Sequence, residues 1–184
     1  MTHYGGKELA ASFRVVRGNT IQIAEDIPEG KYDFKAAPDC RSVAQTLAHI
    51  AVSPGFQHYV HSSKISDLQT VNFMERFQKL GAEETKPRTK AEIIALLKAE
   101  GETFASFLEG LPDRFLEEQV AMPAGAQPAQ KTRFEMLLSA KEHEMHHRGQ
   151  LMVSQRMLGL TPHLTRQMQE RMAQRAAAAA QASR

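Results

Sequence analysis

The stretch Lys141-Glu-His-Glu-Met-His-His-Arg-Gly-Gln-Leu-Met152 indicates both the fold and the site, because His143 and His147 lie four residues apart in a helical pattern. Four residues advance an α-helix by about 400°, so the two imidazoles emerge on one face, one turn apart. Two histidines presented in this way can bind one metal ion together. A third ligand must then come from another segment, and His49 is the best candidate.

The helix face that carries the histidine pair is otherwise apolar. Its other members recur at spacings of three, four or a doubled turn and are Met136, Ala140, Leu151 and Leu158. Burying a polar ring without a partner costs on the order of 1–3 kcal/mol, so the pair needs hydrogen bonds, water or a metal. The residues alone leave a metal site and a hydrogen-bonded polar cluster as equal alternatives.

The segment His143-Glu144-Met145-His146-His147 also matches the metalloprotease motif H-E-x-x-H, in which the glutamate is the general base. The context disfavours a protease. The extended motif needs a third histidine six residues after the second, and that residue is Val153; Glu170, a conceivable downstream ligand, lies in a charged, alanine-rich tail. Few segments have the pattern of substrate-binding strands.

The chain resembles the DinB superfamily of four-helix-bundle metalloproteins. The resemblance rests on His143-x-x-x-His147-Arg148-Gly149-Gln150 together with Arg41-Ser42-Val43 and His49-Ile50, and it spans roughly residues 7–160. It implies that His49, His143 and His147 form a three-histidine site for a divalent metal, with water or substrate completing the shell. Some members resemble low-molecular-weight-thiol transferases or isomerases, and many of these bundles are homodimers.

We therefore expect an all-α fold, a DinB-like four-helix bundle with long connections and a C-terminal helical extension. The bundle should occupy residues 1–162, and residues 163–184 should form an extension of the same domain. The bundle helices should cover 7–26, begin after the capping residues Ser42, Thr89 and Thr132, and end at glycine or proline. Pro54-Gly55 should break the second helix, and a helix starting near Val71 should end at Gly81.

Several side chains carry weaker expectations. Phe73 and Phe77 are assigned to the core rather than to a pocket wall, and His58 and His163 to the surface. Gly149 costs a helix about 1 kcal/mol relative to alanine, which suggests that another helix or a ligand comes close there. The side chains at positions 148 and 150 should hold neighbouring backbone or acids. No general base is identifiable, although Glu142 and Glu144 are candidates for contacts to the ligands.

The composition of the chain limits which binding partners and which cellular compartment we expect. The 184 residues are 42% hydrophobic and 24% charged, and the net charge of +2 is too small to indicate nucleic-acid binding. Cys40 is the only cysteine, so no internal disulfide can form, which suits a reducing cytosol. The sequence shows no signal-peptide pattern and no apolar run of about 20 residues, so we expect a cytoplasmic protein without a membrane span.

Together these features predict a divalent-metal-dependent enzyme. Three imidazoles bind zinc, nickel, iron or manganese, and ligand type does not choose among them. Three protein ligands leave positions open for a small-molecule substrate, as in catalytic sites. The resemblance, not the spacing, implies a low-molecular-weight thiol. Two alternatives stay open: a non-catalytic, stress-related protein that binds a metal or small molecule, and a vestigial, empty site.

Overall fold

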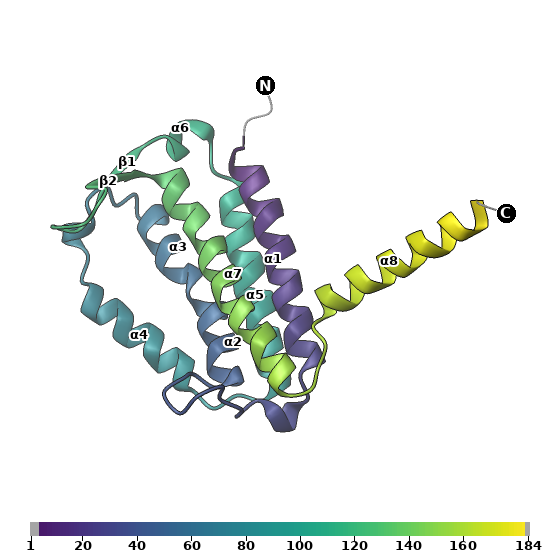
Figure 1. Cartoon of the computed structure of the whole chain (residues 1–184). Helices are drawn as coiled ribbons and strands as arrows, with labels where there is room; N and C mark the ends of the chain where they lie inside the picture. Colours follow the sequence, from purple (N-terminus) through teal and green to yellow (C-terminus); the bar gives the residue numbers. More distant parts are fainter. Residues whose placement is uncertain (1–3, 183–184) are drawn as a thin grey trace.

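The computed structural model describes residues 4–182 and shows a four-helix bundle with one further helix outside it on each side (Figure 1). Three bundle positions are filled by α1 (Gly6–Asp26), α5 (Lys90–Glu109) and α7 (Arg133–Met157). The fourth is shared by α2 (Val43–Val52) and α3 (Pro54–Ser62), which follow one another along the same edge. The core lies between these helices and contains the buried side chains of Phe13, Ile23, Leu47, Leu97, Phe104, Leu137 and Leu151. The expected all-α bundle is confirmed.

Local capping signals explain where the bundle helices begin. Ser42 accepts a hydrogen bond from the Gln45 backbone while the Gln45 side chain accepts one from the Ser42 backbone, and Thr89 and Glu92 form the same reciprocal pair. Each box satisfies two backbone donors that a helix start would leave unpaired. Gly159, with a φ of +77°, lets the chain leave α7 in a left-handed conformation.

Pro54 separates α2 from α3, as the sequence predicts, and a buried arginine supplies the hydrogen bond that the proline removes. Proline has no backbone N–H, so the carbonyl of Ile50, four residues earlier, loses its helical donor. Arg17 from α1 supplies a replacement, because its Nη2 donates to the Ile50 carbonyl at 3.0 Å. The same guanidinium donates to the Leu97 carbonyl of α5 and pairs with Glu144 of α7 at 2.9 Å. Arg17 therefore ties all four bundle positions together.

The connection after α3 contains a longer helix than the sequence predicts. It begins with a short 3-10 turn, η2 (Leu68–Thr70), and continues into α4 (Phe73–Thr85), so the expectation that the helix ends at Gly81 is wrong. Gly81 has open space around it and keeps helical geometry, so the isolated glycine lowers helix propensity without ending the helix. The described side chains of α4 include no fully buried residue. This helix lies beside α2 and α3, outside the bundle (Figure 1).

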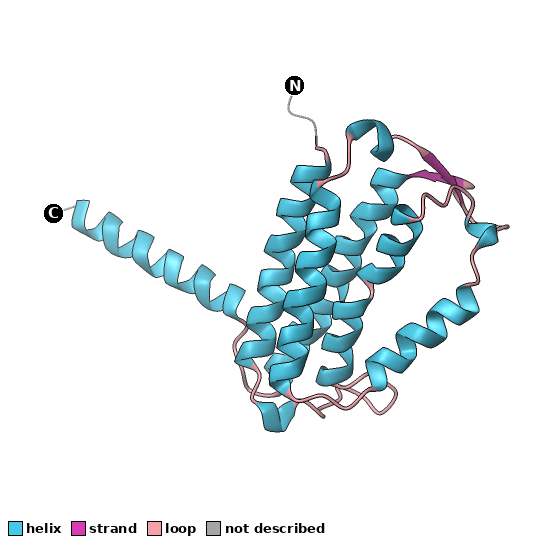
Figure 2. Cartoon of the chain, turned by 180° about the vertical axis from the view of Figure 1, so that it is seen from behind, coloured by secondary structure: helices cyan, strands magenta, loops and turns pink. Residues whose placement is uncertain are grey.

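Two further short elements complete the bundle end opposite the α7–α8 connection. They are the helix α6 (Asp113–Leu116) and an antiparallel pair formed by β1 (Gln119–Ala121) and β2 (Gln130–Thr132). The pair lies at one end of the otherwise helical molecule (Figure 2). At the other end, the 3-10 turn η1 (Glu29–Lys31) leads to Tyr32, whose hydroxyl donates to the Ala24 carbonyl at 2.7 Å.

The last helix, α8 (His163–Ala182), extends away from the bundle (Figure 1). Its first turn is anchored to α1, and the prediction that His163 is exposed is wrong: its side chain is buried and its Nε2 lies 3.1 Å from Asn19 Oδ1 of α1. The ion pair of Arg166 with Asp26 also holds this turn. Within residues 4–182, no helix is both long and apolar enough to cross a membrane.

Candidate metal centre

The bundle brings His49, His143 and His147 together, with one ring nitrogen of each within 4.8 Å of the others. His49 comes from α2, just before the proline break, and the other two come from adjacent turns of α7. The Nε2 atom of His143 lies 3.1 Å from Nε2 of His49 and 3.1 Å from Nε2 of His147. Three nitrogen atoms bound at 2.0–2.1 Å to one tetrahedral ion lie about 3.3 Å apart, so the cluster has the size of a metal site.

Hydrogen bonds at the far side of two rings fix which nitrogen faces the centre. Nδ1 of His49 lies 2.5 Å from a Glu84 carboxylate oxygen, and Nδ1 of His147 lies 2.8 Å from the Gln150 side-chain oxygen. Both acceptors require a protonated Nδ1, so each neutral ring presents an unprotonated Nε2 to the cluster. Such partners orient metal-bound histidines and fix their tautomer in known sites.

This tautomer assignment leaves lone pairs facing one another. His143 Nε2 stands between the Nε2 atoms of His49 and His147, and a single N–H on it cannot point at both. At least one of the two 3.1 Å contacts therefore lacks a hydrogen and is repulsive without a cation. The donor set fits a divalent ion better than it fits a hydrogen-bonded polar cluster.

The electrostatics of the cluster favour neutral imidazoles. Burial and the positive charges of the neighbouring histidines and Arg41 lower the pKa of His143 to about 4. Burial also lowers the pKa of His147, against the opposing effect of its hydrogen bond to Gln150. Neutral rings are the form that binds metal, so at neutral pH little proton release is needed.

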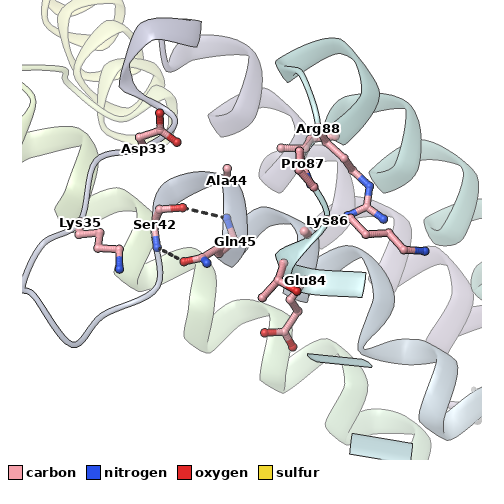
Figure 3. Close-up of a pocket in the computed structure, with 12 residues that line it drawn as sticks. Asp33, Lys35, Ser42, Ala44, Gln45, Glu84, Lys86, Pro87 and Arg88 are labelled. Atoms are coloured by element: carbon pink, nitrogen blue, oxygen red, sulfur yellow. Dashed lines mark hydrogen bonds between the residues drawn. The ribbon is translucent and has the colours of Figure 1, made fainter. Parts of the chain in front are cut away.

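Glu84 links the cluster to α4. Its carboxylate accepts from His49 Nδ1 with one oxygen and from Arg41 Nε, at 2.9 Å, with the other. Burial alone would raise the pKa of Glu84, but these two hydrogen bonds lower it below its usual value. In the adjoining pocket at the start of α2, Glu84 points its carboxylate away from Lys86 and Arg88 (Figure 3), both of which pair with Glu83 instead.

Sequence reasoning missed Glu84 because it lies beyond Gly81, where α4 was expected to end. It also misplaced Gln150, which holds His147 rather than neighbouring backbone or acids and whose amide also contacts His146 Nε2 at 3.0 Å. A signal for Gln150 existed, since it stands three residues after His147 on the same helix. No local signal pointed to Glu84.

Glu144, the glutamate of the H-E-x-x-H match, lies away from the cluster. Its side chain is buried and accepts from Arg17 Nε and Nη2 at distances of 2.9–3.1 Å. The idea that Glu144 contacts a metal ligand is therefore wrong, and a protease mechanism with Glu144 as general base is excluded. Glu142 is exposed on the same helix.

Two pockets adjoin the cluster. The first, of about 610 Å³, is bounded by His49 and His143 and lies between α4 and the bundle; its further lining includes Arg41, Ser53, Phe56, Gln57, Phe77, Leu80, Glu84 and Ser139. The second, of about 510 Å³, contains His147 and Gln150 with Cys40, Val43 and Val153. The three histidines are thus accessible to small molecules.

The structure corrects two predictions about this region, one of them in part. Phe77, assigned to the core, is 61% exposed and lines the first pocket, because α4 stands outside the bundle. At Gly149 the expectation of a close helix is wrong, because a Cβ atom built there meets no other described part of the chain within 4 Å; the approach of a ligand stays a prediction. His58, predicted at the surface or a pocket rim, is half-buried and packs edge-on against Phe107.

Comparison with known proteins identifies the family. The sequence profile of the DinB family matches residues 1–179. The chain belongs to the DinB family. It is 25% identical over 154 residues to YjoA of Bacillus subtilis, a protein described as uncharacterised, and the match covers 84% of this chain and 91% of YjoA. The crystal structure of YjoA superimposes with a TM-score of 0.63, over 84% of this chain and 94% of that one.

Two more distant structures share the fold. YfiT from Bacillus subtilis, described as a probable metal-dependent hydrolase with an unusual four-helix bundle topology, has a TM-score of 0.66 at 15% identity, covering 88% of this chain and 91% of YfiT. A mycothiol-dependent maleylpyruvate isomerase has a TM-score of 0.61 at 11% identity, covering 82% of this chain and 63% of the isomerase. At these identities the likeness supports the four-helix bundle and leaves the reaction to be argued from the site.

Proposed function

We propose that this protein is a divalent-metal-dependent enzyme in which His49, His143 and His147 hold the ion. The observation that carries the proposal is the convergence of three Nε2 atoms, of which those of His49 and His147 are unprotonated because Nδ1 of each ring donates a hydrogen bond. Among the described residues, three side chains group in a way that could hold an ion, and two pockets adjoin them. Structural zinc sites are usually closed by four protein ligands, so this arrangement favours catalysis.

The chemistry of the site divides between the ion and the protein. A bound divalent ion supplies Lewis acidity and lowers the pKa of a water or thiol ligand. Glu84 and Gln150 keep the His49 and His147 rings oriented. The described lining of the larger pocket contains one carboxylate, Glu84, and it is already engaged with His49 and Arg41. The protein thus orients the metal-binding rings, and the one described carboxylate that lines this pocket is already paired.

The reaction we propose uses a low-molecular-weight thiol as nucleophile or co-substrate, with hydrolysis as the second candidate. Two separate pockets at one cluster fit a reaction in which two small molecules meet. Among proteins with the same fold, one is described as mycothiol-dependent and one as a probable hydrolase. The native ion is one of zinc, nickel, iron and manganese, since three imidazoles accept each of them.

The assembly we propose is a homodimer of the 1–162 bundle, with residues 163–184 as an extension of the same domain. The supporting feature is α8, whose Met168 and Met172 side chains are 57% and 62% exposed along a helix that leaves the bundle. Light scattering during size-exclusion chromatography tests it, and a single mass near 20.5 kDa would contradict the dimer.

Elemental analysis of untagged protein tests the metal site. We expect close to one divalent ion per chain in the wild type and loss of that ion in His49→Ala, His143→Ala and His147→Ala. His58→Ala is the matched control, because His58 packs on Phe107 away from the cluster and should leave the metal content unchanged. A wild-type protein that neither contains nor takes up any of the four ions would overturn the proposal.

Activity assays then choose the reaction class. Metal-loaded protein should turn over model electrophiles in the presence of a small thiol, and His143→Ala should not. Turnover without thiol would favour hydrolysis. Full metal occupancy with no exchangeable ligand position, and unfolding when the metal is removed, would instead indicate a structural ion in a non-catalytic binding protein.

A further inference from the structure

The larger pocket beside the histidines has one apolar wall and one cationic corner. Phe56 of α3 and Phe77 and Leu80 of α4 form the wall. Phe73 joins the two aromatic rings into a row, at centroid distances of 5.7 Å to Phe56 and 6.0 Å to Phe77. The outer member of the row, Phe77, is 61% exposed, so a ligand in the pocket would remove a large apolar surface from water.

Arg41 is the cationic corner, and part of its hydrogen-bonding capacity is unused. Its Nε donates to Glu84, whereas neither Nη atom donates to any residue that the structure describes. Its side chain is 45% exposed and lines both pockets. Two parallel N–H groups of a guanidinium match the two oxygens of a carboxylate in geometry and charge.

The charge balance of this corner favours an anion. The described lining of the larger pocket holds one cation, Arg41, and one anion, Glu84, beside the two ligand histidines His49 and His143. Those two charges cancel, so a divalent ion on the histidines would leave the pocket with an excess of two positive charges. A site lined by one sign of charge within low-dielectric walls attracts and retains ligands of the opposite sign.

We propose that the pocket between α4 and the bundle binds a carboxylate substrate with an aromatic or aliphatic body, with its carboxylate on the Arg41 Nη atoms and its body against Phe56, Phe77 and Leu80. This substrate class rests on the proposed metal site, because the reactive end of the molecule must reach His49 and His143. The second pocket, beside His147, remains available for the co-substrate.

Direct binding of small probes to zinc-loaded protein tests the proposal. The probes are 3-phenylpropionate, its uncharged amide, and acetate, which lacks the apolar body; calorimetry or ligand-observed NMR measures their Kd values. We expect 3-phenylpropionate to bind about tenfold or more tightly than either other probe. Hydrogen bonds between charged groups are stronger than those between neutral groups. Arg41→Gln should therefore raise the Kd of 3-phenylpropionate by about tenfold or more and leave the Kd of the amide nearly unchanged.

Two further variants separate the wall from the corner. Phe77→Ala should raise the Kd values of 3-phenylpropionate and of the amide by a similar factor of about three to ten, because the substitution removes only apolar contact. Arg148→Gln removes an arginine of α7 that lines neither pocket and should leave both Kd values unchanged. Thermal melts and zinc content of each variant exclude misfolding and metal loss as causes.

The outcomes distinguish this proposal from the metal proposal. Equal binding of 3-phenylpropionate to wild type and Arg41→Gln would place the carboxylate elsewhere and overturn the inference, even with zinc fully bound. Equal Kd values for the acid and its amide would also overturn it. If the wild type binds no zinc but still binds 3-phenylpropionate in an Arg41- and Phe77-dependent way, the metal proposal fails and the assignment of the pocket holds.

Discussion

Two polar clusters meet α7 within one helical turn, and they differ in how completely their hydrogen-bonding groups are paired. The closed cluster is the buried ion pair of Glu144 with Arg17, whose guanidinium also donates to the Ile50 and Leu97 carbonyls. The open cluster is the three histidines: hydrogen bonds hold Nδ1 of His49 and of His147, while the three Nε2 atoms face one another beside two pockets. A satisfied cluster fixes structure, whereas an unsatisfied one is prepared for a ligand.

The largest expected effect comes from breaking the closed cluster. Glu144→Ala leaves the Arg17 charge buried without its partner, and uncompensated buried charges typically cost 3–5 kcal/mol. We expect urea denaturation to show a loss of that size in the free energy of unfolding. Glu142→Ala, an exposed neighbour on the same helix, should change it by no more than about 0.5 kcal/mol.

A double substitution tests why the closed cluster matters. Arg17→Met with Glu144→Leu removes both charges, so it should recover much of the loss seen in Glu144→Ala. Recovery should be incomplete because the Ile50 carbonyl at the Pro54 break then lacks a donor, at a cost of about 1–3 kcal/mol. A Glu144→Ala protein as stable as the wild type would show that the ion pair is dispensable and that the contrast between the clusters is wrong.

The second-largest expected effect is the gain in stability when zinc binds to the open cluster. Free zinc at one hundred times its Kd should raise the free energy of unfolding of the wild type by about 2.7 kcal/mol, since the ion binds only the folded chain. His147→Ala should lose this gain, because one of three ligands is gone. Thermal melts with and without zinc measure it, and His58→Ala should keep the full increase.

A smaller effect is expected at Gly101, which makes room for Arg17. A Cβ atom at position 101 would lie 2.8 Å from Arg17 Cγ and 3.0 Å from its Nη1. The arginine is held by Glu144 and two carbonyls and cannot move aside freely. Gly101→Ala should therefore destabilise the protein by about 1–3 kcal/mol despite the better helix propensity of alanine. Denaturation that shows a gain in stability would mean that the closed cluster is loosely packed.

The sequence predicts the parts of this fold that depend on neighbouring residues. Ser42 with Gln45 and Thr89 with Glu92 are read from spacing alone, and the four-residue spacing of the α7 histidines places them on one face. His49 was chosen as the candidate third ligand from another helical segment, and the family resemblance implies the same residue, but a contact across nearly a hundred residues leaves no local pattern that could place it beside the pair. Its convergence with the α7 pair is a property of the bundle.

The closed cluster was missed although a signal for it existed. Arg17 falls on the same apolar stripe of α1 as Phe13 and Thr20, and Glu144 falls on a stripe of α7 with Ala140 and Leu151. One cation and one anion on two inward-facing stripes predict a buried ion pair. Glu84 offered no such signal, since its place depends on how α4 docks beside α2.

The smallest expected change in stability is at Gly149 of α7, whose surroundings differ from those of Gly101. Gly149 lies two residues after His147, and a Cβ there meets nothing within 4 Å, unlike one at Gly101. Gly149→Ala should therefore raise the free energy of unfolding by up to about 1 kcal/mol, the usual difference in helix propensity, without changing zinc affinity. Denaturation and zinc titration of the same samples measure both quantities. A loss of stability or of zinc affinity would mean that a ligand or a second chain approaches the helix at Gly149, because residues 4–182 place nothing within 4 Å of a Cβ atom there.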